Sequence, residues 1–353
     1  MAWSCGIVGL PNAGKSTLFK ALTAQEVTIE NYPFSTIDPN KAVVALPDQR
    51  LSALAELSGS EKVTPAAIEV IDVAGLVEGA SRGEGLGNQF LGHLRNVDLL
   101  IHVLAGFSSS LVKMNDPAAR IEIVNLELCL ADLEVIDRRQ QKVEPKLRSG
   151  EKEAKFELDL LSRLEKHLNK GLPLRSMDFA PAEKVVLDQL SLLTRKEMVY
   201  IYNLADDMFS DPDLSAFPPG SNIIPICARL EAELTDLSRE EREPFLEAYG
   251  LKRSQTERLL AECYSLLNLV TFYTVKGIEA KAWVVPAGIR SVEAAAKVHS
   301  DIERGFINVE VISWDCLINE GGLVRAREKG LSHIEGRDYK VQDGDVLYFR
   351  FRN

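Results

Sequence analysis

The stretch Gly9-Leu10-Pro11-Asn12-Ala13-Gly14-Lys15-Ser16 reads G-x-x-x-x-G-K-S, the spacing of a phosphate-binding P-loop. The apolar run 3–8 before it predicts a buried strand, and the segment 17–22 after it predicts a helix. Glycines let the backbone curl around an oxyanion, and the amino end of the helix adds partial positive charge. A Gly-rich turn beside a surface lysine is the alternative, but the strand and the helix favour phosphate binding.

The motif also predicts which groups bind a nucleoside triphosphate and its metal ion. We expect Lys15 to act catalytically at the β and γ phosphates, and the Ser16 hydroxyl to bind Mg²⁺. Asn12 is a candidate ligand for a monovalent cation such as K⁺. The nucleotide-binding residues expected in this stretch are Gly9, Leu10, Pro11, Asn12, Ala13, Gly14, Lys15, Ser16 and Thr17.

Two segments downstream carry further candidates. The segment 31–40 has two prolines and two asparagines, which predict a loop, and its Thr36 is the candidate for completing the Mg²⁺ shell. The apolar strand 66–72 ends in Asp72, which we expect to hold the metal ion through water. Gly75 follows in D-x-x-G spacing and is expected to sense the γ-phosphate. A simple connection at Thr36 and a cap at Asp72 are the alternatives.

Leu76 takes the position where many GTPases have a glutamine that orients the attacking water. Leucine cannot form that hydrogen bond, so the sequence predicts slow intrinsic hydrolysis. The glycine-rich run 78–89 predicts a segment that orders on nucleotide binding, with a plain flexible loop as the alternative. In the buried strand predicted at 98–104, His102 is expected to be a satisfied core histidine rather than a catalyst.

Composition limits the class of protein. The net charge of −11 argues against broad nonspecific nucleic-acid binding, and no apolar run approaches the ~20 residues of a membrane span. The beginning of the chain lacks the pattern of a signal peptide. Five scattered cysteines without C-x-x-C indicate reduced thiols in a cytosolic protein, with neither disulfides nor a zinc site.

The P-loop, the segment 31–40 and the run 72–89 resemble the YchF family, also called Obg-like ATPases. The resemblance extends over essentially the whole chain. It implies an α/β fold, in which a P-loop NTPase domain carries an inserted α-helical coiled-coil arm and is followed by a β-grasp (TGS, ubiquitin-like) domain. It also implies an ATPase that associates with the ribosome or its RNA and acts in translation or stress responses. In that family a hydrophobic residue replaces the glutamine, as Leu76 does here.

The loop 107–116 departs from the family pattern, because it is shorter and lacks the histidine that some members have there. The group that assists hydrolysis is therefore left open.

We predict four segments along the chain. The NTPase domain comprises 1–116 and 194–267, the helical arm 117–193, and the C-terminal domain 268–353. Apolar spacing of three to five residues indicates the arm helices, and the break 169–173 is predicted as the tip or the return of an antiparallel pair. Its charged faces indicate solvated surface, with partner binding as the alternative.

The C-terminal segment alternates like a sheet. The expected elements are a hairpin of 271–275 and 280–285, a helix at 291–299 with Ser291 as its N-cap, and strands at 308–312 and 345–351. His299 and Asp301 are expected to have structural roles. Three basic residues are candidates for contacts with RNA phosphate, with solvated surface as the favoured alternative: Arg325, Arg327 and Lys329.

The sequence leaves the choice of base open. The strand 197–202 ends at Asn203-Leu204-Ala205-Asp206, where guanine-specific relatives have N-K-x-D and the family resembled has N-x-x-E. Asp206 can accept hydrogen bonds from guanine, whereas Leu204 lacks the lysine stem that packs on that base. Cys227-Ala228-Arg229 stands where related GTPases have S-A-K. The residues expected near the base, with Asn203 in contact with it, are Asn203, Leu204, Asp206, Cys227 and Ala228.

The leading hypothesis is a cytoplasmic, monomeric, Mg²⁺-dependent ATPase that acts as a switch on the ribosome, with no membrane or DNA partner. The missing lysine and the family resemblance favour ATP. A GTP-selective switch, supported by Asp206, is the second hypothesis. The third is a scaffold whose docking depends on nucleotide occupancy and whose turnover is negligible.

Overall fold

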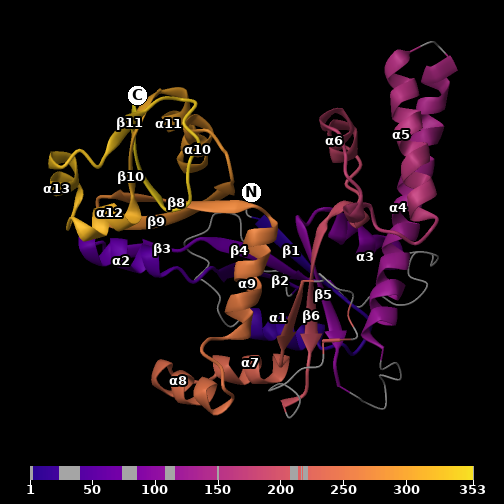
Figure 1. The fold of residues 1–353 in the computed structure, drawn as a ribbon, viewed down its shortest axis with the longest axis horizontal. Coiled ribbons are helices and arrows are strands. Elements are labelled where there is room, and N and C mark those ends of the chain that lie inside the picture. The colour runs from indigo at the N-terminus through magenta and orange to yellow at the C-terminus, as the bar shows by residue number, and fades with distance from the viewer. Residues whose placement is uncertain are drawn as a thin grey trace.

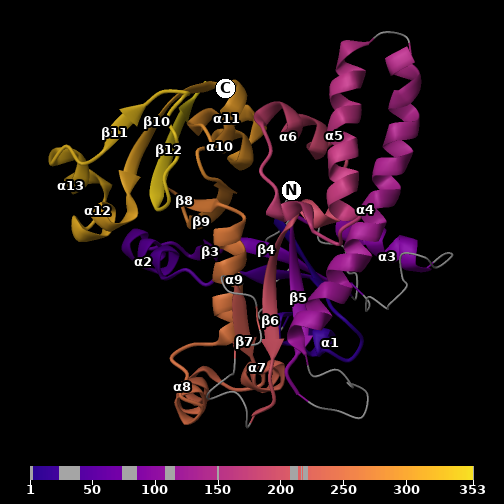
Figure 2. The same ribbon diagram turned by 45° about the vertical axis from the view of Figure 1, so that its right-hand side comes forward.

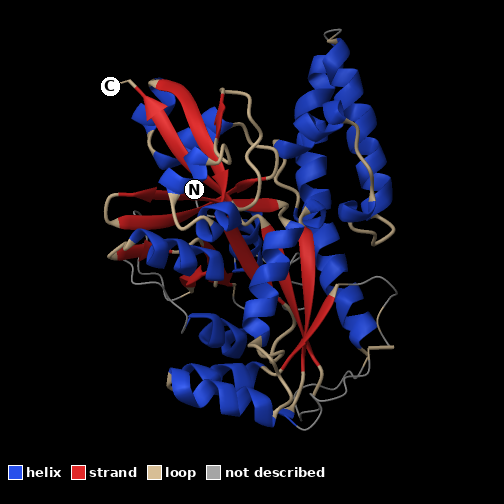
Figure 3. Ribbon diagram, turned by 60° about the vertical axis from the view of Figure 1, so that its left-hand side comes forward, coloured by secondary structure: helices blue, strands red, loops and turns tan. Residues whose placement is uncertain are grey.

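The structure, a computed structural model, describes residues 3–23, 40–73, 86–107, 116–148, 151–206, 214–215, 217 and 222–352. It does not describe the side chains of 86–90, Lys152 and Arg239. Within these limits the chain forms two six-stranded sheets, surrounded by helices, and a long helical arm (Figure 1). Figure 3 distinguishes the strands of both sheets from the helices around them.

The first sheet carries the P-loop and has the strand order β2-β4-β1-β5-β6-β7. β2 is antiparallel to β4, and the other neighbours are parallel. The strands predicted at 3–8, 66–72, 98–104 and 197–202 are confirmed. The strands of this sheet are β1 (Trp3–Val8), β2 (Lys41–Ala45), β4 (Ala67–Asp72), β5 (Leu99–Ala105), β6 (Glu197–Asn203) and β7 (Ile223–Ile226).

Helices cover both faces of this sheet. They include α1 (Lys15–Thr23), α3 (Leu86–Arg95) and α9 (Gln255–Leu266), while α7 (Ala228–Thr235) packs against α1 and α8 (Arg239–Ala248) lies beside α7 (Figure 1). Successive side chains of a strand point to opposite faces. Ile7 therefore packs with Leu18 of α1 and Leu259 of α9, whereas its neighbour Val8 packs with Leu94 of α3. The parallel sheet is buried on both sides, as its continuous apolar strands predict.

The arm projects from the sheet as an antiparallel helix pair (Figure 2). Its elements are α4 (Pro117–Arg148), α5 (Lys152–Leu168), the 3₁₀ turns Leu174–Ser176 and Leu193–Arg195, and α6 (Pro181–Asp188). The pair turns between α4 and α5, so of the two alternatives predicted for 169–173 the tip is wrong and the return is confirmed. Those residues instead follow the end of α5, where the chain returns towards the sheet. Among the helices that the structure describes, none combines the length and the apolar character that a bilayer crossing requires.

The second sheet contains the C-terminal strands in the order β11-β10-β12-β8-β9-β3. The predicted hairpin and the strands around 308–312 and 345–351 are confirmed. Its strands are β3 (Lys62–Thr64), β8 (Leu269–Lys276), β9 (Glu279–Pro286), β10 (Phe306–Ser313), β11 (His333–Glu335) and β12 (Asp345–Phe351). Its short helices are α10 (Ser291–Val298), α11 (Ser300–Arg304), α12 (Trp314–Asn319) and α13 (Leu323–Glu328).

Ser291 is not the N-cap of α10, contrary to the prediction. Arg290 takes that position, because Glu293 accepts a hydrogen bond from its backbone N–H over 2.9 Å. The Ser291 hydroxyl is fully buried and donates to the carbonyl of Gly336 over 2.7 Å. His299 caps α11 instead, since its Nδ1 accepts from the backbone N–H of Asp301 over 3.1 Å. That contact confirms a structural role for His299.

The two sheets are joined by a segment that the sequence reasoning did not identify. Between β2 and β4 the chain leaves the first sheet, forms α2 (Gln49–Ser58) and then adds β3 in parallel to β9 of the second sheet. The Thr64 hydroxyl donates to Glu279 of β9 over 2.7 Å, and Lys62 forms an ion pair with the same carboxylate at 3.1 Å. The second sheet is therefore completed by a strand from the first half of the chain.

A polar network fixes α2 against β8 and the turn before β12. Tyr273, which is fully buried, donates its hydroxyl hydrogen to Asp48, the N-cap of α2. Arg50 bonds Asp48 at 2.9 Å and Asp343 at 2.6 Å, and its guanidinium lies 5.5 Å from the centre of the Tyr273 ring. Asp343 also accepts from the backbone N–H of Thr271 over 2.8 Å. One arginine thus connects carboxylates that are nearly 300 residues apart in sequence.

We expect Tyr273→Phe to lower the free energy of unfolding by about 1.5 kcal/mol, because the partly buried carboxylate of Asp48 loses a hydrogen bond. Chemical denaturation measures the change. Tyr249→Phe is the matched control, since Tyr249 is exposed. A loss no larger than that of the control would show that the Tyr273 hydroxyl does not stabilise the junction.

Candidate nucleotide-binding site

The P-loop connects β1 to α1 at the carboxyl edge of the first sheet. Gly9 and Gly14 have φ angles of +147° and +93°, which side chains rarely allow. A Cβ on Gly9 would lie 2.4 Å from the carbonyl oxygen of Val103, and one on Gly14 would lie 2.1 Å from Nδ2 of Asn203. Both glycines are therefore required by the backbone path and by its close neighbours. Asn12, at φ +61°, is left-handed as well.

Lys15 is buried within the loop that it follows. Its ammonium donates to the carbonyl of Gly9 over 3.0 Å and to that of Leu10 over 2.9 Å. Burial lowers the pKa of Lys15, and the nearby carboxylate of Asp72 acts in the opposite direction. Phosphate oxygens carry more negative charge than carbonyls and form stronger, charge-assisted hydrogen bonds. The arrangement therefore holds a cation at the place where the motif predicts the phosphates.

Asp72 ends β4, directly beside the P-loop strand. Its register partner in β1 is Ile7, and its backbone N–H donates to the carbonyl of Asn40 over 2.8 Å. Among the described residues its buried Oδ1 has no hydrogen-bond partner. A buried carboxylate oxygen without a partner is costly, and an oxygen-seeking ion with its water shell would satisfy it. Asp72 and the exposed hydroxyl of Ser16 thus fit Mg²⁺ by their chemistry.

Two predicted site residues, Thr36 and Gly75, lie outside the described residues, as does Leu76. Their expected roles stay predictions. No group of three or more metal-binding side chains was found in the part of the chain that the structure describes. All five cysteines are free.

Asn203 joins the P-loop to the turn that precedes α7. It is 5% exposed at the end of β6, its Nδ2 donates to the carbonyl of Ala13 over 2.9 Å, and its Oδ1 accepts from the backbone N–H of Ala228 over 3.0 Å. The sequence predicted only a contact with the base. The structure assigns its amide a second task, because it fixes the distance between the phosphate loop and the base-side turn.

The remaining base-side candidates lie around that turn. Leu204 is buried, and it packs with Cys227 and Leu230 rather than lying open as a lysine stem would. The Cys227 thiol donates to Oδ1 of Asp206 over 3.1 Å, and Nη2 of Arg229 lies 3.6 Å from Oδ2. Arg229 also lines a cavity of about 360 Å³, which lies between the start of α1 and α7. Its lining residues are Ser16, Thr17, Lys20, Arg229, Ala232, Glu233 and Asp236.

His102 is fully buried in β5, as predicted for a core histidine. The expectation that it is satisfied is wrong within the described structure, where neither ring nitrogen has a hydrogen-bond partner. Its ring lies 5.6 Å from that of Tyr200. Burial, together with the charges of Arg175 and Lys15, lowers the pKa of His102 to about 3, so the imidazole is neutral at pH 7.

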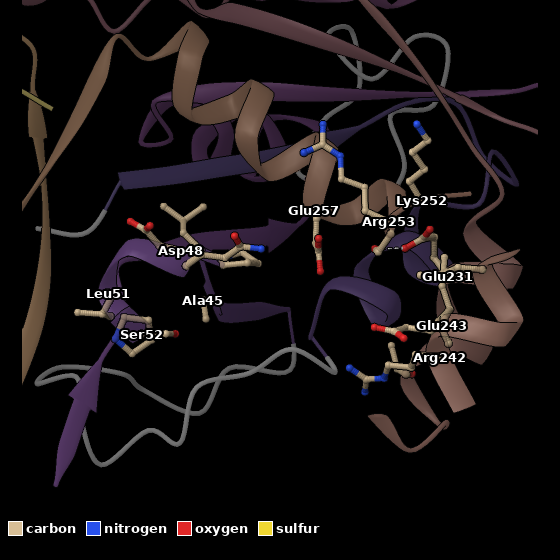
Figure 4. Close-up of a pocket in the computed structure, with 18 of the residues that line it drawn as sticks. Ala45, Asp48, Leu51, Ser52, Glu231, Arg242, Glu243, Lys252, Arg253 and Glu257 are labelled. Carbon is tan, nitrogen blue, oxygen red and sulfur yellow. Dashed lines mark hydrogen bonds between the residues drawn. The ribbon is translucent and has the colours of Figure 1, made fainter. Parts of the chain in front are cut away.

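A second, larger cavity of about 660 Å³ was not predicted (Figure 4). It lies between the start of α2 and helices α7 to α9. Its wall carries acidic side chains, such as Asp48, and basic ones, such as Arg253. Glu231, which is buried, is engaged in structure rather than free for a ligand. Its carboxylate accepts from the backbone N–H of Gln255 over 2.7 Å and from the Thr256 hydroxyl over 3.0 Å, so it caps α9.

Two of the basic candidates for RNA contact are paired with carboxylates. Arg327 forms two 2.6 Å hydrogen bonds to Glu310, and Lys329 lies 2.6 Å from Glu320. Hydrogen bonds from Arg327 are the main cause that lowers the pKa of Glu310 to about 2. The structure therefore favours the alternative of structural and solvated roles for Arg327 and Lys329.

Comparisons with known proteins agree with this architecture. A family model described as 50S ribosome-binding GTPase matches residues 4–141, and a C-terminal YchF GTPase model, described as a protein of unknown function, matches residues 269–352. A Bacillus subtilis protein named ribosome-binding ATPase YchF is 42% identical, over 99% of this chain and 100% of its own length. Its Haemophilus ducreyi counterpart is 43% identical over 99% of each chain. The structure of the Schizosaccharomyces pombe YchF GTPase superposes with a TM-score of 0.87, at 29% identity, over 99% of this chain and 97% of that one.

We expect Asn203→Ala to destabilise the protein by about 2 kcal/mol or more, because a buried carbonyl and a buried N–H lose their partners. Thermal and chemical unfolding without added nucleotide measure the effect. Asn96→Ala, at an exposed position, is the matched control. Equal stability of the two variants would show that the Asn203 amide does not hold the two loops together.

The Glu310 pair predicts a pH dependence. Since the folded pKa of Glu310 is about 2, below its ordinary value of 4.5, the pair stabilises the fold above about pH 4.5 and loses this effect as the pH falls towards 2. Arg327→Ala should therefore lower stability at pH 7, and its difference from the unchanged protein should shrink between pH 4.5 and 2. Chemical denaturation at several pH values tests this, with Arg325→Ala as control. A pH-independent difference would contradict it.

Proposed function

This chain belongs to the YchF family, and from that premise we propose that it is a Mg²⁺-dependent ATPase that binds the ribosome and acts as a nucleotide-controlled switch. The observation that carries the proposal is the buried ammonium of Lys15, enclosed by the P-loop beside Asp72, whose Oδ1 has no hydrogen-bond partner among the residues that the structure describes. A cation and a free carboxylate oxygen at one edge of a parallel sheet suit a triphosphate with its metal ion.

Each part of the site has a proposed task. The P-loop residues 9–17 surround the phosphates, and Ser16, Thr36 and Asp72 hold Mg²⁺, the last through water. When bound, Mg²⁺ neutralises negative charge on the phosphate oxygens. Lys15 stabilises charge on the transferred phosphoryl group, and the Gly75 N–H senses the γ-phosphate. The Asn12 side chain is the proposed ligand for K⁺.

Turnover is proposed to be slow without a partner. Leu76 supplies no hydrogen bond for the attacking water, and orientation of that water is a large part of hydrolysis in related enzymes. His102 does not fill this role, because its side chain is fully buried in β5. We infer that docking on the ribosome completes the site.

The division of labour along the chain is proposed as follows. Segments 1–116 and 194–267 bind the nucleotide. The ribosome is contacted by the arm 117–193 and by the C-terminal segment 268–353, which is a TGS-type β-grasp domain. The protein is proposed to be a cytoplasmic monomer. The relatives named ribosome-binding ATPase support the cytoplasmic part of this proposal.

Calorimetric titration with ATP and GTP, each with and without Mg²⁺, tests the function. We expect Lys15→Ala to weaken the binding of ATP by at least about tenfold, because its ammonium no longer meets the phosphates. Asp72→Asn should still bind ATP, but most of the increase in ATP affinity that Mg²⁺ gives should be lost. Lys166→Ala, exposed near the end of α5, is the control.

Phosphate release and co-sedimentation with ribosomes complete the test. Hydrolysis should require Mg²⁺, rise with ribosomes and differ between K⁺ and Na⁺. Equal rates in K⁺ and Na⁺ would refute the role of Asn12. Binding of neither nucleotide by the unchanged protein would refute the proposed function as a whole.

A further inference from the structure

Asp206 stands where guanine-specific relatives place a carboxylate that accepts from N1–H and from the exocyclic amine of the base. Reading guanine in this way requires both carboxylate oxygens to face the base. In this chain each oxygen already faces a group of the protein. The Cys227 thiol donates to Oδ1 over 3.1 Å, and Nη2 of Arg229 lies 3.6 Å from Oδ2.

The Cys227 thiol is a permanent donor. It is 2% exposed in an apolar cluster with Leu204 and Leu230, at the residue before α7. Burial, with a contribution from Asp206, raises the pKa of Cys227 to about 11. The thiol therefore keeps its proton at pH 7 and directs it at Oδ1.

Arg229 contributes a guanidinium group, which can only donate hydrogen bonds and cannot accept them. Its Nε also bonds Glu233, one turn later in α7, over 3.1 Å. The guanidinium lines the 360 Å³ cavity together with Ser16 and Thr17 of α1. The guanidinium thus reaches both Asp206 and the cavity at the start of α1, and it supplies only donors, whereas the N1–H and exocyclic amine of guanine need acceptors.

We propose that Cys227 and Arg229 together withdraw Asp206 from base recognition, and that this pair sets a preference for adenine over guanine nucleotides. The inference rests on the proposed function, because it names the residues that select the base at the same site. A thiol is a weak donor and an exposed ion pair contributes only about 0–1 kcal/mol, so neither residue suffices alone.

The decisive variant is Cys227→Ala combined with Arg229→Ala. Calorimetry with Mg²⁺ and either ATP or GTP gives the ratio of the two dissociation constants. We expect the affinity for GTP relative to ATP to rise by about tenfold in this variant, which corresponds to about 1.4 kcal/mol. Each single change should give less than the pair. Adding Asp206→Asn to the double variant should abolish the gain, because the freed carboxylate is then missing.

Three controls separate a change in base selectivity from damage to the turn before α7. Cys227→Ser keeps a donor to Oδ1, so its ratio should stay within about threefold of that of the unchanged protein. Glu233→Gln removes the other carboxylate partner of Arg229 and should leave the preference for ATP in place. Asp206→Asn in the unchanged background should also keep the ratio, since Asp206 does not read the base.

The outcomes distinguish this inference from the function beneath it. If both nucleotides bind and the double variant keeps the original ratio, the pair does not select the base, although the ATPase proposal stands. If the double variant binds neither nucleotide, the single variant Asp206→Asn provides the test. A tenfold loss of GTP relative to ATP in that variant would show that Asp206 reads guanine, and would overturn the inference. If the unchanged protein binds neither nucleotide, the proposed function is refuted, and the inference about base selection falls with it.

Discussion

The side-chain amide of Asn203 is the interaction on which the candidate site depends. It donates to the phosphate loop at Ala13 and accepts from the base-side turn at Ala228, so one planar group sets the spacing of both. The absence of a side chain at Gly14 is what allows this approach. In a poorly solvated interior such a doubly satisfied amide is rigid, and a group left unpaired would be costly. Phosphate and base recognition are thereby built into one unit.

The same principle operates between the sheets. Asp48, Arg50, Tyr273 and Asp343 form a polar network that is buried at Tyr273 and exposed at Asp343, while α2 contributes its apolar Leu51 and Leu54 to the main core. The C-terminal sheet is therefore attached by hydrogen bonds and by packing, in addition to the chain connection through α9. The distance between the phosphate site and the C-terminal sheet is set by this attachment.

Sequence reasoning succeeded where structure is decided locally. Alternation and apolar runs predicted the strands on both sides of the P-loop, and the hairpin around Gly277 followed from turn chemistry. It failed where partners are distant. β3 is three residues long and pairs with β9, about 215 residues later, and Ser291 bonds Gly336, 45 residues away. Ser149-Gly150 is a turn signal that the sequence reasoning passed over, because good helix formers resume at once at Lys152–Lys155. The orientation of Asp206 depended likewise on Cys227, 21 residues on.

The shared strand also orders events during synthesis. Thr64 leaves the ribosome about 215 residues before Glu279, its hydrogen-bond partner. At 5–20 residues per second, this separation corresponds to a delay of roughly 10–40 s. Throughout that interval β3 has no β9 beside it, and the apolar face of α2 has no β8 to cover it. The first half of the chain is thus made with an unfinished surface, which only the last quarter of the protein can close.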